Sequence, residues 1–253
     1  MSAYKLIFLN QKGGVGKTTS VVNLGAALAM LGKKVLLIDF DSQGNLTSSV
    51  SADGDAPGVY EVITQQIGAL DACQSTSITN LHVISGNIDL AGLNVELVQE
   101  ENRDFFIQKT FAPLDAVYDY ILGDCPPSLG ILTVNSLVWA EHVIIPLQCE
   151  YLAMEGLNLL MRTVSSVRKS LNTNLDILGI LFTMYSKRNK LSYEVVEDVT
   201  KYFPQKVFKT IIPRNVRLSE APSHGLPIFA YDANCSGAKA YMSFAKEVIK
   251  RVE

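Results

Sequence analysis

Residues 12–19 read KGGVGKTT, and this stretch decides the class of fold that we expect for the chain. It directly follows a short apolar run at residues 5–10 and opens an amphipathic stretch at residues 18–31. Glycines let backbone amides approach phosphate oxygens, and a helix N-terminus adds partial positive charge. The order of strand, glycine-rich loop and helix therefore predicts a loop that binds nucleotide phosphates.

Two side chains in this stretch suit a bound nucleotide. Lys17 can reach the β- and γ-phosphates, and the Thr18 hydroxyl can ligate Mg²⁺. The usual GxxxxGK[ST] pattern has glycine where this chain has Gln11, but a second lysine, Lys12, stands at the start of the loop. The alternative is a glycine-rich turn without a ligand, and the Gly-Lys-Thr-Thr order before a helix argues against it.

Short apolar runs and helical patterns alternate along the rest of the chain. The runs that we predict as strands lie at residues 34–39, 81–84, 120–123, 142–147, 177–182 and 209–212. A helical pattern at residues 152–171 lies between two of them. This alternation predicts a doubly wound α/β fold with a mainly parallel sheet flanked by helices. We expect one domain over residues 1–253, with residues 51–58 as a surface loop.

Three aspartates follow two of the predicted strands. Asp39 and Asp41 lie at the end of the run at residues 34–39, and Asp124 follows the run at residues 120–123. Ligands of doubly wound sheets bind at the carboxyl ends of strands, so all three can face the phosphates. Asp124 suits the holding of Mg²⁺ through a water, and Asp41 suits orientation of the attacking water. The alternative for any one of these aspartates, considered alone, is a helix cap or a turn residue.

The composition excludes several classes of protein. Hydrophobic residues make up 48% of the 253 residues and charged residues 19%, which argues against a disordered chain. The longest apolar stretch, residues 129–147, carries polar and charged side chains and is not a membrane span. The four cysteines lie far apart without a CxxC pair, against a zinc site, an iron–sulfur scaffold or a disulfide framework. We expect no signal peptide and a cytoplasmic location.

Charge is distributed unevenly along the chain. The formal net charge is −3, yet residues 186–253 hold 12 basic and 7 acidic side chains, a net of +5. The first 185 residues therefore carry a net of −8. This asymmetry is expected of a protein with one surface that faces a polyanion, and a lysine-rich solvated helix is the alternative.

Together the motifs resemble those of the ParA/MinD superfamily of ATPases, whose deviant Walker A motif carries the early lysine found here as Lys12. Residues 39–45 are similar to the family's Walker A′ motif, and residues 121–128 to its Walker B motif. Residues 148–156 and 212–225 are similar to the chromosomal, Soj-type ParA members in particular.

Two positions beside functional aspartates depart from the family pattern. Ser42 follows Asp41 where the family usually has proline. Gly123 precedes Asp124 where the family usually has a β-branched or aliphatic residue. Both substitutions keep the aspartates in place, so they bear on the stiffness of the loops rather than on activity.

The resemblance implies an Mg²⁺-dependent ATPase that forms a homodimer with ATP. Lys12 would reach across the two-fold interface to the partner's nucleotide, where a second cation neutralises transition-state charge. Asp41 would activate water, Thr18 and Asp124 would hold Mg²⁺, and Lys17 would act on the phosphates. The residues implied in phosphate binding are Lys12, Gly13, Gly14, Val15, Gly16, Lys17, Thr18 and Thr19.

Pro213 and Asn215 match family positions that contact the adenine, and a plain loop after residues 209–212 is the alternative. The resemblance also implies that Arg188 and Arg217 contact double-stranded DNA without sequence preference. Such phosphate contacts weaken steeply with salt. A ParB-like partner protein would stimulate hydrolysis, and the protein would be nucleoid-associated.

The main alternative is a MinD-like ATPase that binds membrane as an ATP dimer. It would need a free amphipathic C-terminal helix, whereas the apolar stripe at residues 241–249 is more typical of a helix that packs on its own core. We therefore expect no stable membrane binding. An iron–sulfur carrier on the same fold would need paired cysteines, and an adaptor with an inactive site would lack Lys12, Lys17, Asp41 and Asp124.

Overall fold

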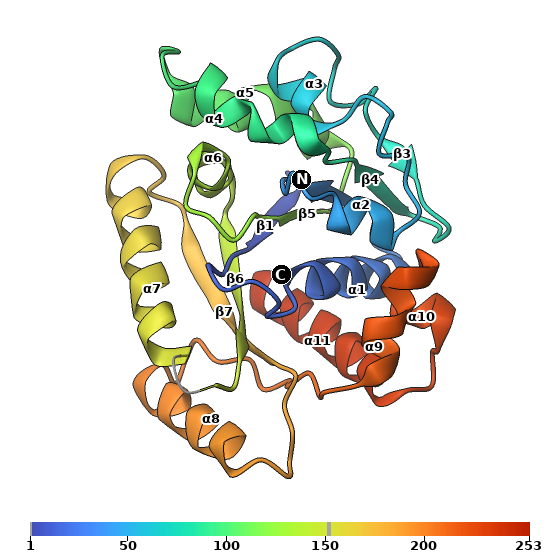
Figure 1. The fold of residues 1–253 in the computed structure, drawn as a ribbon, viewed down its shortest axis with the longest axis vertical. Helices are drawn as coiled ribbons and strands as arrows, with labels where there is room; N and C mark the ends of the chain where they lie inside the picture. Colours follow the sequence, from blue (N-terminus) through green and yellow to red (C-terminus); the bar gives the residue numbers. More distant parts are fainter. Residues whose placement is uncertain (1, 151–152) are drawn as a thin grey trace.

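The computed structural model describes residues 2–150 and 153–253, and in this part of the chain a seven-stranded sheet forms the centre (Figure 1). The strand order is β3-β4-β2-β5-β1-β6-β7, and only the β3–β4 pair is antiparallel. The strands are β1 (Tyr4–Phe8), β2 (Val35–Asp39), β3 (Gln74–Ser75), β4 (Leu81–Ile84), β5 (Tyr120–Asp124), β6 (His142–Gln148) and β7 (Asp176–Thr183). The predicted doubly wound α/β fold is confirmed.

Helices lie on both faces of the sheet (Figure 1). The helix predicted at residues 152–171 is found at Ala153–Ser170, and residues 151–152 lie outside the described part. The α-helices are α1 (Lys17–Met30), α2 (Asn45–Ser49), α3 (Val59–Ile63), α4 (Leu93–Glu96), α5 (Phe106–Phe111), α6 (Ile131–Trp139), α7 (Ala153–Ser170), α8 (Lys190–Tyr202), α9 (Val216–Glu220), α10 (Ile228–Tyr231) and α11 (Ser236–Val252). Short 3₁₀ helices are η1 (Ile88–Ala91), η2 (Arg103–Phe105), η3 (Ala112–Ala116) and η4 (Ala221–His224).

The strands are apolar on both faces because each face is covered. Along β1, Ile7 packs in the cluster that includes α6 and α7, whereas Leu6 and Phe8 pack in the cluster that includes α1 and α11. Successive side chains of a strand point to opposite faces, so a strand buried on both sides reads as a continuous apolar run. The short runs in the sequence therefore identified the parallel strands.

The strand predicted at residues 209–212 is wrong. No strand forms at residues 209–212, and isolated bridges flank them, from Val207 to Ile180 of β7 and from Pro213 to Tyr185. The amides of Lys209 and Thr210 instead donate to the carboxylate of Glu247 on α11, at 2.8 and 2.9 Å. A side chain from a distant helix thus takes the two donors that a strand ladder would use. The edge strand β3 has no counterpart among the predicted strands, because two residues carry no alternation pattern, whereas β4 matches the run predicted at residues 81–84.

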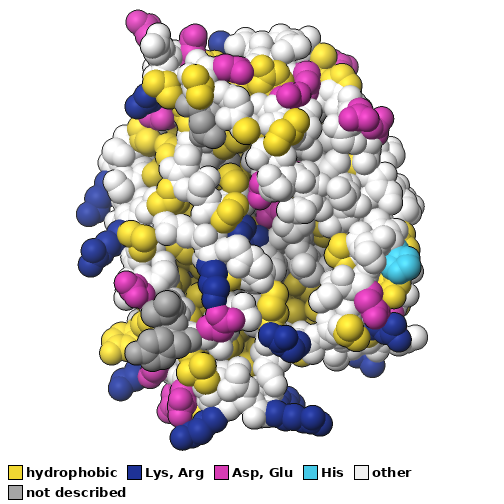
Figure 2. Space-filling view, in the orientation of Figure 1, with side chains coloured by type: hydrophobic (Ala, Val, Ile, Leu, Met, Phe, Trp, Pro, Cys, Tyr) yellow, Lys and Arg dark blue, Asp and Glu magenta, His cyan; other side chains and the backbone are white. Residues whose placement is uncertain are grey.

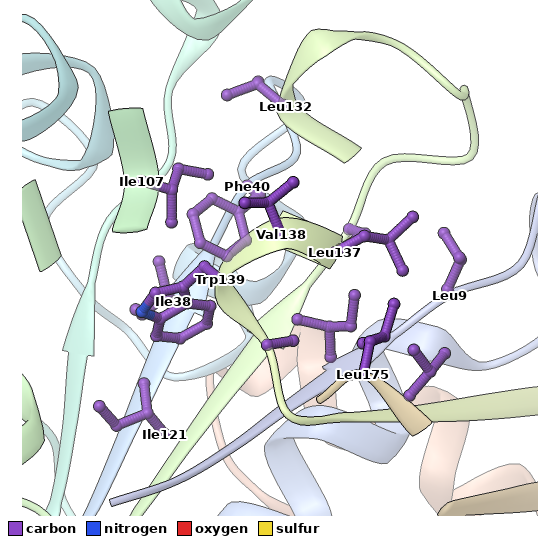
Figure 3. Packing of buried hydrophobic residues seen from close by; sticks show 14 of the residues in the cluster. Leu9, Ile38, Phe40, Ile107, Ile121, Leu132, Leu137, Val138, Trp139 and Leu175 are labelled. Carbon is purple, nitrogen blue, oxygen red and sulfur yellow. The ribbon is translucent and has the colours of Figure 1, made fainter. Parts of the chain in front are cut away.

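An aromatic cluster packs directly beneath the ends of β2 and β5 (Figure 3). Phe40 meets Trp139 and Phe111 edge to face, with ring centroids 6.2 and 6.0 Å apart. A Cβ added to Gly123 would lie 2.8 Å from a ring carbon of Phe40 and 3.2 Å from Ile7 Cγ2. The departure at Gly123 therefore makes room for Phe40 and leaves the following Asp124 firmly placed.

Helix α11 docks on the sheet beside α1. Its stripe of Tyr241, Phe244 and Val248 is buried, and the Tyr241 hydroxyl lies 3.0 Å from Ser20 Oγ of α1. The prediction that this stripe packs on the protein's own core is confirmed. No helix within the described residues has the length and apolar content needed to cross a membrane.

The docking of α11 is tested by Phe244→Ala. Phe244 is fully buried and contacts Phe208 edge to face, with ring centroids 4.9 Å apart. Removal of a buried Phe ring leaves a cavity, so we expect a loss of about 3–5 kcal/mol in the free energy of unfolding. Urea denaturation measures it. Lys246→Ala, at an exposed position of the same helix, should stay within about 0.5 kcal/mol. An unchanged midpoint for Phe244→Ala would contradict the docking.

Candidate nucleotide site

Three parallel strands end side by side where the glycine-rich loop begins. Phe8 at the end of β1 is paired with Asp124 of β5, and Asp124 is paired with Asp39 of β2. From β1 the chain runs through the loop and enters α1 at Lys17. The first turn of α1, with backbone amides that have no partner within the helix, thus lies at the carboxyl ends of these strands. Ligands of doubly wound sheets bind at this edge.

Hydrogen bonds to other segments fasten the loop. Asn10 Nδ2 donates to the carbonyl of Pro146 at 2.7 Å, and Asn10 Oδ1 accepts the backbone N–H of Lys12 at 3.0 Å. Thr183, the last residue of β7, donates its hydroxyl to the carbonyl of Val15 at 2.8 Å. The Val15 side chain is buried. The protein itself therefore holds the loop at its start and near its end.

Two of the three loop glycines are required by backbone geometry. Gly14 has φ +72° and Gly16, the N-cap of α1, has φ +85°, in a region that costs other residues about 1–2 kcal/mol. Gly13 has no positive φ, and a Cβ there would meet nothing within 4 Å. The fold therefore does not demand glycine at position 13, where the missing side chain suits close approach of a phosphate.

Five of the eight predicted phosphate residues line one surface pocket, whereas Lys12, Gly13 and Val15 do not line it. Gly14, Gly16, Lys17, Thr18 and Thr19 line it, together with part of α2. Lys17 is largely buried, and its Nζ lies 3.5 Å from the carbonyl of Lys12. The Thr18 hydroxyl donates to Asp124 Oδ2 at 2.6 Å, which joins the start of α1 to the end of β5.

Asp124 is a buried carboxylate whose second oxygen has no hydrogen-bond partner among the described residues. Burial and the nearby charge of Asp39 raise the pKa of Asp124 to about 8, against the opposing effects of Thr18 and Lys17. A cation close by would stabilise the ionised form. Carboxylate and hydroxyl oxygens are ligands that Mg²⁺ accepts. The residues present therefore fit an Mg²⁺ ion that accompanies nucleotide phosphates.

Both carboxylate oxygens of Asp39 accept hydrogen bonds within the protein. The expectation that all three aspartates face the phosphates is therefore wrong for Asp39. Its Oδ2 accepts the N–H of Thr47 at 2.9 Å and the Thr47 hydroxyl at 2.8 Å, and its Oδ1 accepts the N–H of Asp41 at 3.2 Å. Burial raises the pKa of Asp39 to about 6. Asp41 remains half-buried, and its Oδ1 accepts the N–H of Gln43 at 3.1 Å.

A cavity of about 270 Å³ lies beside the loop, between the end of β7 and α9. Pro213 and Asn215 line it together with Gly16 and Thr19 of the loop region. The amide of Asn215 is already engaged: Oδ1 caps α9 through the N–H of residue 217 at 2.8 Å, and Nδ2 donates to Ser236 Oγ at 2.8 Å. The structure thus places both predicted adenine residues next to the phosphate pocket.

Lys12 lies on the outer side of the loop. Its side chain is 55% exposed and forms an ion pair with Glu150, which follows β6 in the same chain. The second lysine is therefore at the phosphate loop, and its ammonium group has a carboxylate partner within the chain.

The two arginines expected to contact DNA differ in their surroundings. Arg188 is exposed in the turn before α8. Arg217, at the start of α9, forms ion pairs with Glu220 at 2.9 Å and Asp232 at 3.6 Å. Lys and Arg side chains project from the lower edge of the face shown in Figure 2, where α8 lies in Figure 1.

Comparison with known proteins identifies the family. The family described as "AAA domain" (AAA_31) matches residues 4–177. The chromosome-partitioning ATPase Soj of Treponema pallidum (strain Nichols) is 56% identical over 248 residues, with 97% of each chain covered. The chain belongs to the ParA/Soj family of partition ATPases. This membership confirms the resemblance and supports a partition function over the MinD-like alternative.

Solved structures share the fold over almost the whole chain. Cobyrinic acid a,c-diamide synthase from Mycobacterium smegmatis, with bound ADP and magnesium, is 37% identical with a TM-score of 0.86, covering 99% of this chain and 95% of that one. A putative plasmid partition protein from Borrelia burgdorferi B31, bound to AMPPNP, is 26% identical with a TM-score of 0.85, covering 99% and 100%.

Several residues that build the site are not among those predicted from the sequence. Thr183, the last residue of β7, and Met184, which follows it, lie beside the loop, and the rule that ligands bind at the carboxyl ends of strands could have found them. Asn10, Thr47 and Glu150 carry no such signal. Their roles depend on partners that are remote along the chain.

Asp124→Asn tests the buried carboxylate. Without metal, native Asp124 keeps its proton to about pH 8, whereas an unfolded Asp ionises near pH 4. The native state then binds more protons than the unfolded state between these values, so stability falls as pH rises through this window. In EDTA, Asp124→Asn should flatten that fall by up to about 1.4 kcal/mol per pH unit, and it should lose Mg²⁺-dependent ATP hydrolysis.

Urea denaturation from pH 5 to pH 8.5 measures the slope, and phosphate release measures hydrolysis. Asp55→Asn, at an exposed position outside the site, is the control and should change neither. An Asp124→Asn protein with the wild-type slope would show that the carboxylate is not the group that titrates.

Proposed function

We propose that ATP with Mg²⁺ drives this partition ATPase into a homodimer that binds double-stranded DNA without sequence preference. The observation that carries the proposal is a phosphate loop with two lysines: Lys17 is largely buried beside Thr18, and Lys12 is exposed on the outer side. A buried lysine serves the nucleotide of its own chain. The exposed lysine at the same loop can act on the nucleotide of a second copy when it exchanges its ion pair with Glu150.

Each residue of the site has a role in this proposal. The amides of residues 13–19 and Lys17 bind the phosphates, and Thr18 and Asp124 hold Mg²⁺, with Asp124 acting through water. Bound Mg²⁺ neutralises negative charge on the phosphate oxygens. Asp41 orients the attacking water, because phosphoryl transfer needs positioning and charge stabilisation more than covalent chemistry. Pro213 and Asn215 contact the adenine.

Dimerisation moves Lys12 from one carboxylate to the partner's phosphates. In the single chain Lys12 pairs with Glu150, and both side chains are substantially exposed. Exposed ion pairs contribute only about 0–1 kcal/mol, so triphosphate oxygens at the interface can displace Glu150. There the second cation stabilises transition-state charge.

DNA binding would use the basic C-terminal part of the chain. Residues 186–253 carry a net of +5, and Arg188 is exposed in the turn before α8. Contacts of this kind go to backbone phosphates and carry no sequence information. A ParB-like partner would stimulate hydrolysis and return the dimer to monomers. The whole chain would act as one ATPase domain that associates with the nucleoid.

Asp41→Ala tests the hydrolytic role. The variant should bind ATP and dimerise but release phosphate at least about 100-fold more slowly, because the group that positions water is gone. Sedimentation velocity with ATP measures the dimer, and phosphate release measures turnover. Asp55→Ala provides a matched exposed control. Wild-type turnover by Asp41→Ala would remove Asp41 from the mechanism.

The function is tested by binding to random-sequence duplex DNA with ATP–Mg²⁺, with ADP–Mg²⁺ and without nucleotide, across a salt series. We expect binding only with ATP and a steep fall with salt. Lys12→Ala should lose both the ATP-dependent dimer and this binding. Liposomes of anionic lipid are measured in parallel. Binding to liposomes but not to DNA would favour the MinD-like function, and binding to neither would leave a protein partner as the output.

A further inference from the structure

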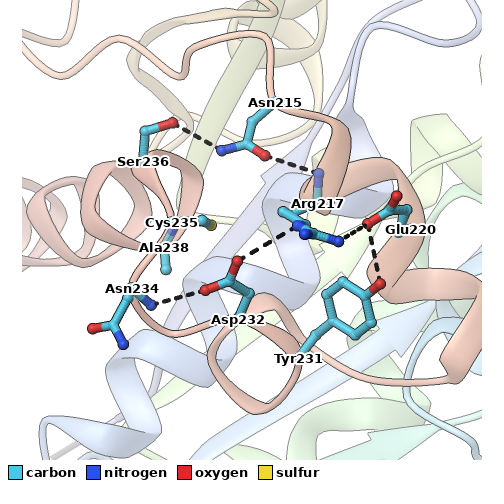
Figure 4. A network of polar contacts seen from close by, with 9 residues as sticks. All are labelled: Asn215, Arg217, Glu220, Tyr231, Asp232, Asn234, Cys235, Ser236 and Ala238. Atoms are coloured by element: carbon cyan, nitrogen blue, oxygen red, sulfur yellow. Dashed lines mark hydrogen bonds and ion pairs between the residues drawn. The ribbon is translucent and has the colours of Figure 1, made fainter.

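Arg217 lies in a cluster of polar side chains from two adjacent segments near the C-terminus (Figure 4). We call Arg217, Glu220, Tyr231 and Asp232 the Arg217 cluster. The Arg217 NH1 atom lies 2.9 Å from Glu220 Oε2, and Arg217 Nε lies 3.6 Å from Asp232 Oδ2. The Tyr231 hydroxyl donates to the same Glu220 oxygen at 3.0 Å. Two carboxylates thus hold a single guanidinium in place, and the Tyr231 hydroxyl holds one of these carboxylates.

The net negative charge of the Arg217 cluster does not favour the binding of a polyanion. One cation faces two anions, so the cluster has a net charge of −1 although Arg217 itself is half exposed. A DNA phosphate that approaches Arg217 meets Glu220 and Asp232 beside it. The residue expected to bind DNA is therefore neutralised in this single chain.

The same short helix that carries Arg217 also lines the cavity beside the phosphate loop. Leu218 and Ser219 of α9, and Pro222 of η4, face that cavity. Asn215 caps α9 and at the same time bonds to Ser236 at the start of α11. The Arg217–Glu220 pair lies within α9, whereas Asp232 belongs to a different segment, so only the Arg217–Asp232 distance depends on where α9 lies.

We infer that Glu220 and Asp232 restrain DNA binding by holding Arg217 in ion pairs. This inference rests on the proposed DNA-binding function. Ion pairs between partly exposed side chains are weak, so several DNA phosphates together can displace the two carboxylates from Arg217. The two carboxylates thus keep this part of the surface from being permanently cationic.

The test is the double variant Glu220→Gln, Asp232→Asn. Both changes keep a side-chain oxygen, for the Tyr231 hydroxyl and for the N–H of Asn234 respectively, while the negative charges disappear. We expect the nucleotide-free protein to bind random-sequence duplex DNA at least about threefold more tightly than the wild type. The slope of log affinity against log salt should become steeper by about 0.9, the value for one added phosphate contact.

Two controls separate release of Arg217 from a general change of charge. Glu101→Gln with Asp55→Asn removes the same two charges at exposed positions outside the cluster and should leave the affinity unchanged. Arg217→Gln added to the double variant should abolish the gain. Thermal unfolding of each variant checks that the fold is retained.

The outcomes distinguish this inference from the proposed function. If wild-type protein fails to bind DNA with ATP–Mg²⁺, the proposed function fails and the inference fails with it. If the wild type binds with ATP but the double variant behaves like the charge control, only the inference is overturned. A gain that persists after Arg217→Gln would overturn it as well.

Discussion

The site depends on the burial of two carboxylates on neighbouring strands. Asp39 and Asp124 are paired in register at the ends of β2 and β5, and burial raises the pKa of both. Buried charge is costly unless it is bonded or paired. For Asp39, hydrogen bonds from Thr47 and from the backbone N–H of Asp41 offset this cost. Asp124 has one bond, from Thr18, and leaves the other oxygen for a ligand.

Asp39 therefore has a structural role, whereas Asp124 keeps one oxygen for a ligand. The bonds of Asp39 to Thr47 and Asp41 pin the segment that carries the proposed water-orienting carboxylate. The bond between Thr18 and Asp124 ties the phosphate loop to the second strand end. Beneath them, Phe40 and Trp139 pack around Gly123 and keep the two strand ends rigid. The positions of the proposed catalytic groups therefore follow from packing as much as from their own chemistry.

Charged residues of the proposed dimer and DNA surfaces are paired within the single chain. Lys12 pairs with Glu150, and Arg217 pairs with Glu220 and Asp232. Both cations lie at the surface, where ion pairs are weak and are readily exchanged for phosphate oxygens. In the proposed mechanism, nucleotide would change the partners of these few side chains, and the sheet need not change.

The fold class, the phosphate loop and the aspartates at strand ends could all be predicted from the sequence. Their signals are local: apolar runs of strand length, glycines before Lys17, and acidic residues directly after a run. The wrong strand at residues 209–212 and the internal use of Asp39 could not be foreseen. In both cases a partner remote along the chain, Glu247 or Thr47, takes the hydrogen bonds.

By itself, then, the sequence determined which chemical groups this protein has and at which strand ends they stand. Only the tertiary structure decided which of those groups are free. One buried oxygen of Asp124 has no hydrogen-bond partner among the described residues, whereas both oxygens of Asp39 are bonded. Arg188 is exposed, whereas Arg217 is held by two carboxylates. Hydrogen bonds and ion pairs act over a few ångströms in space, and local sequence patterns do not record which remote segments come that close.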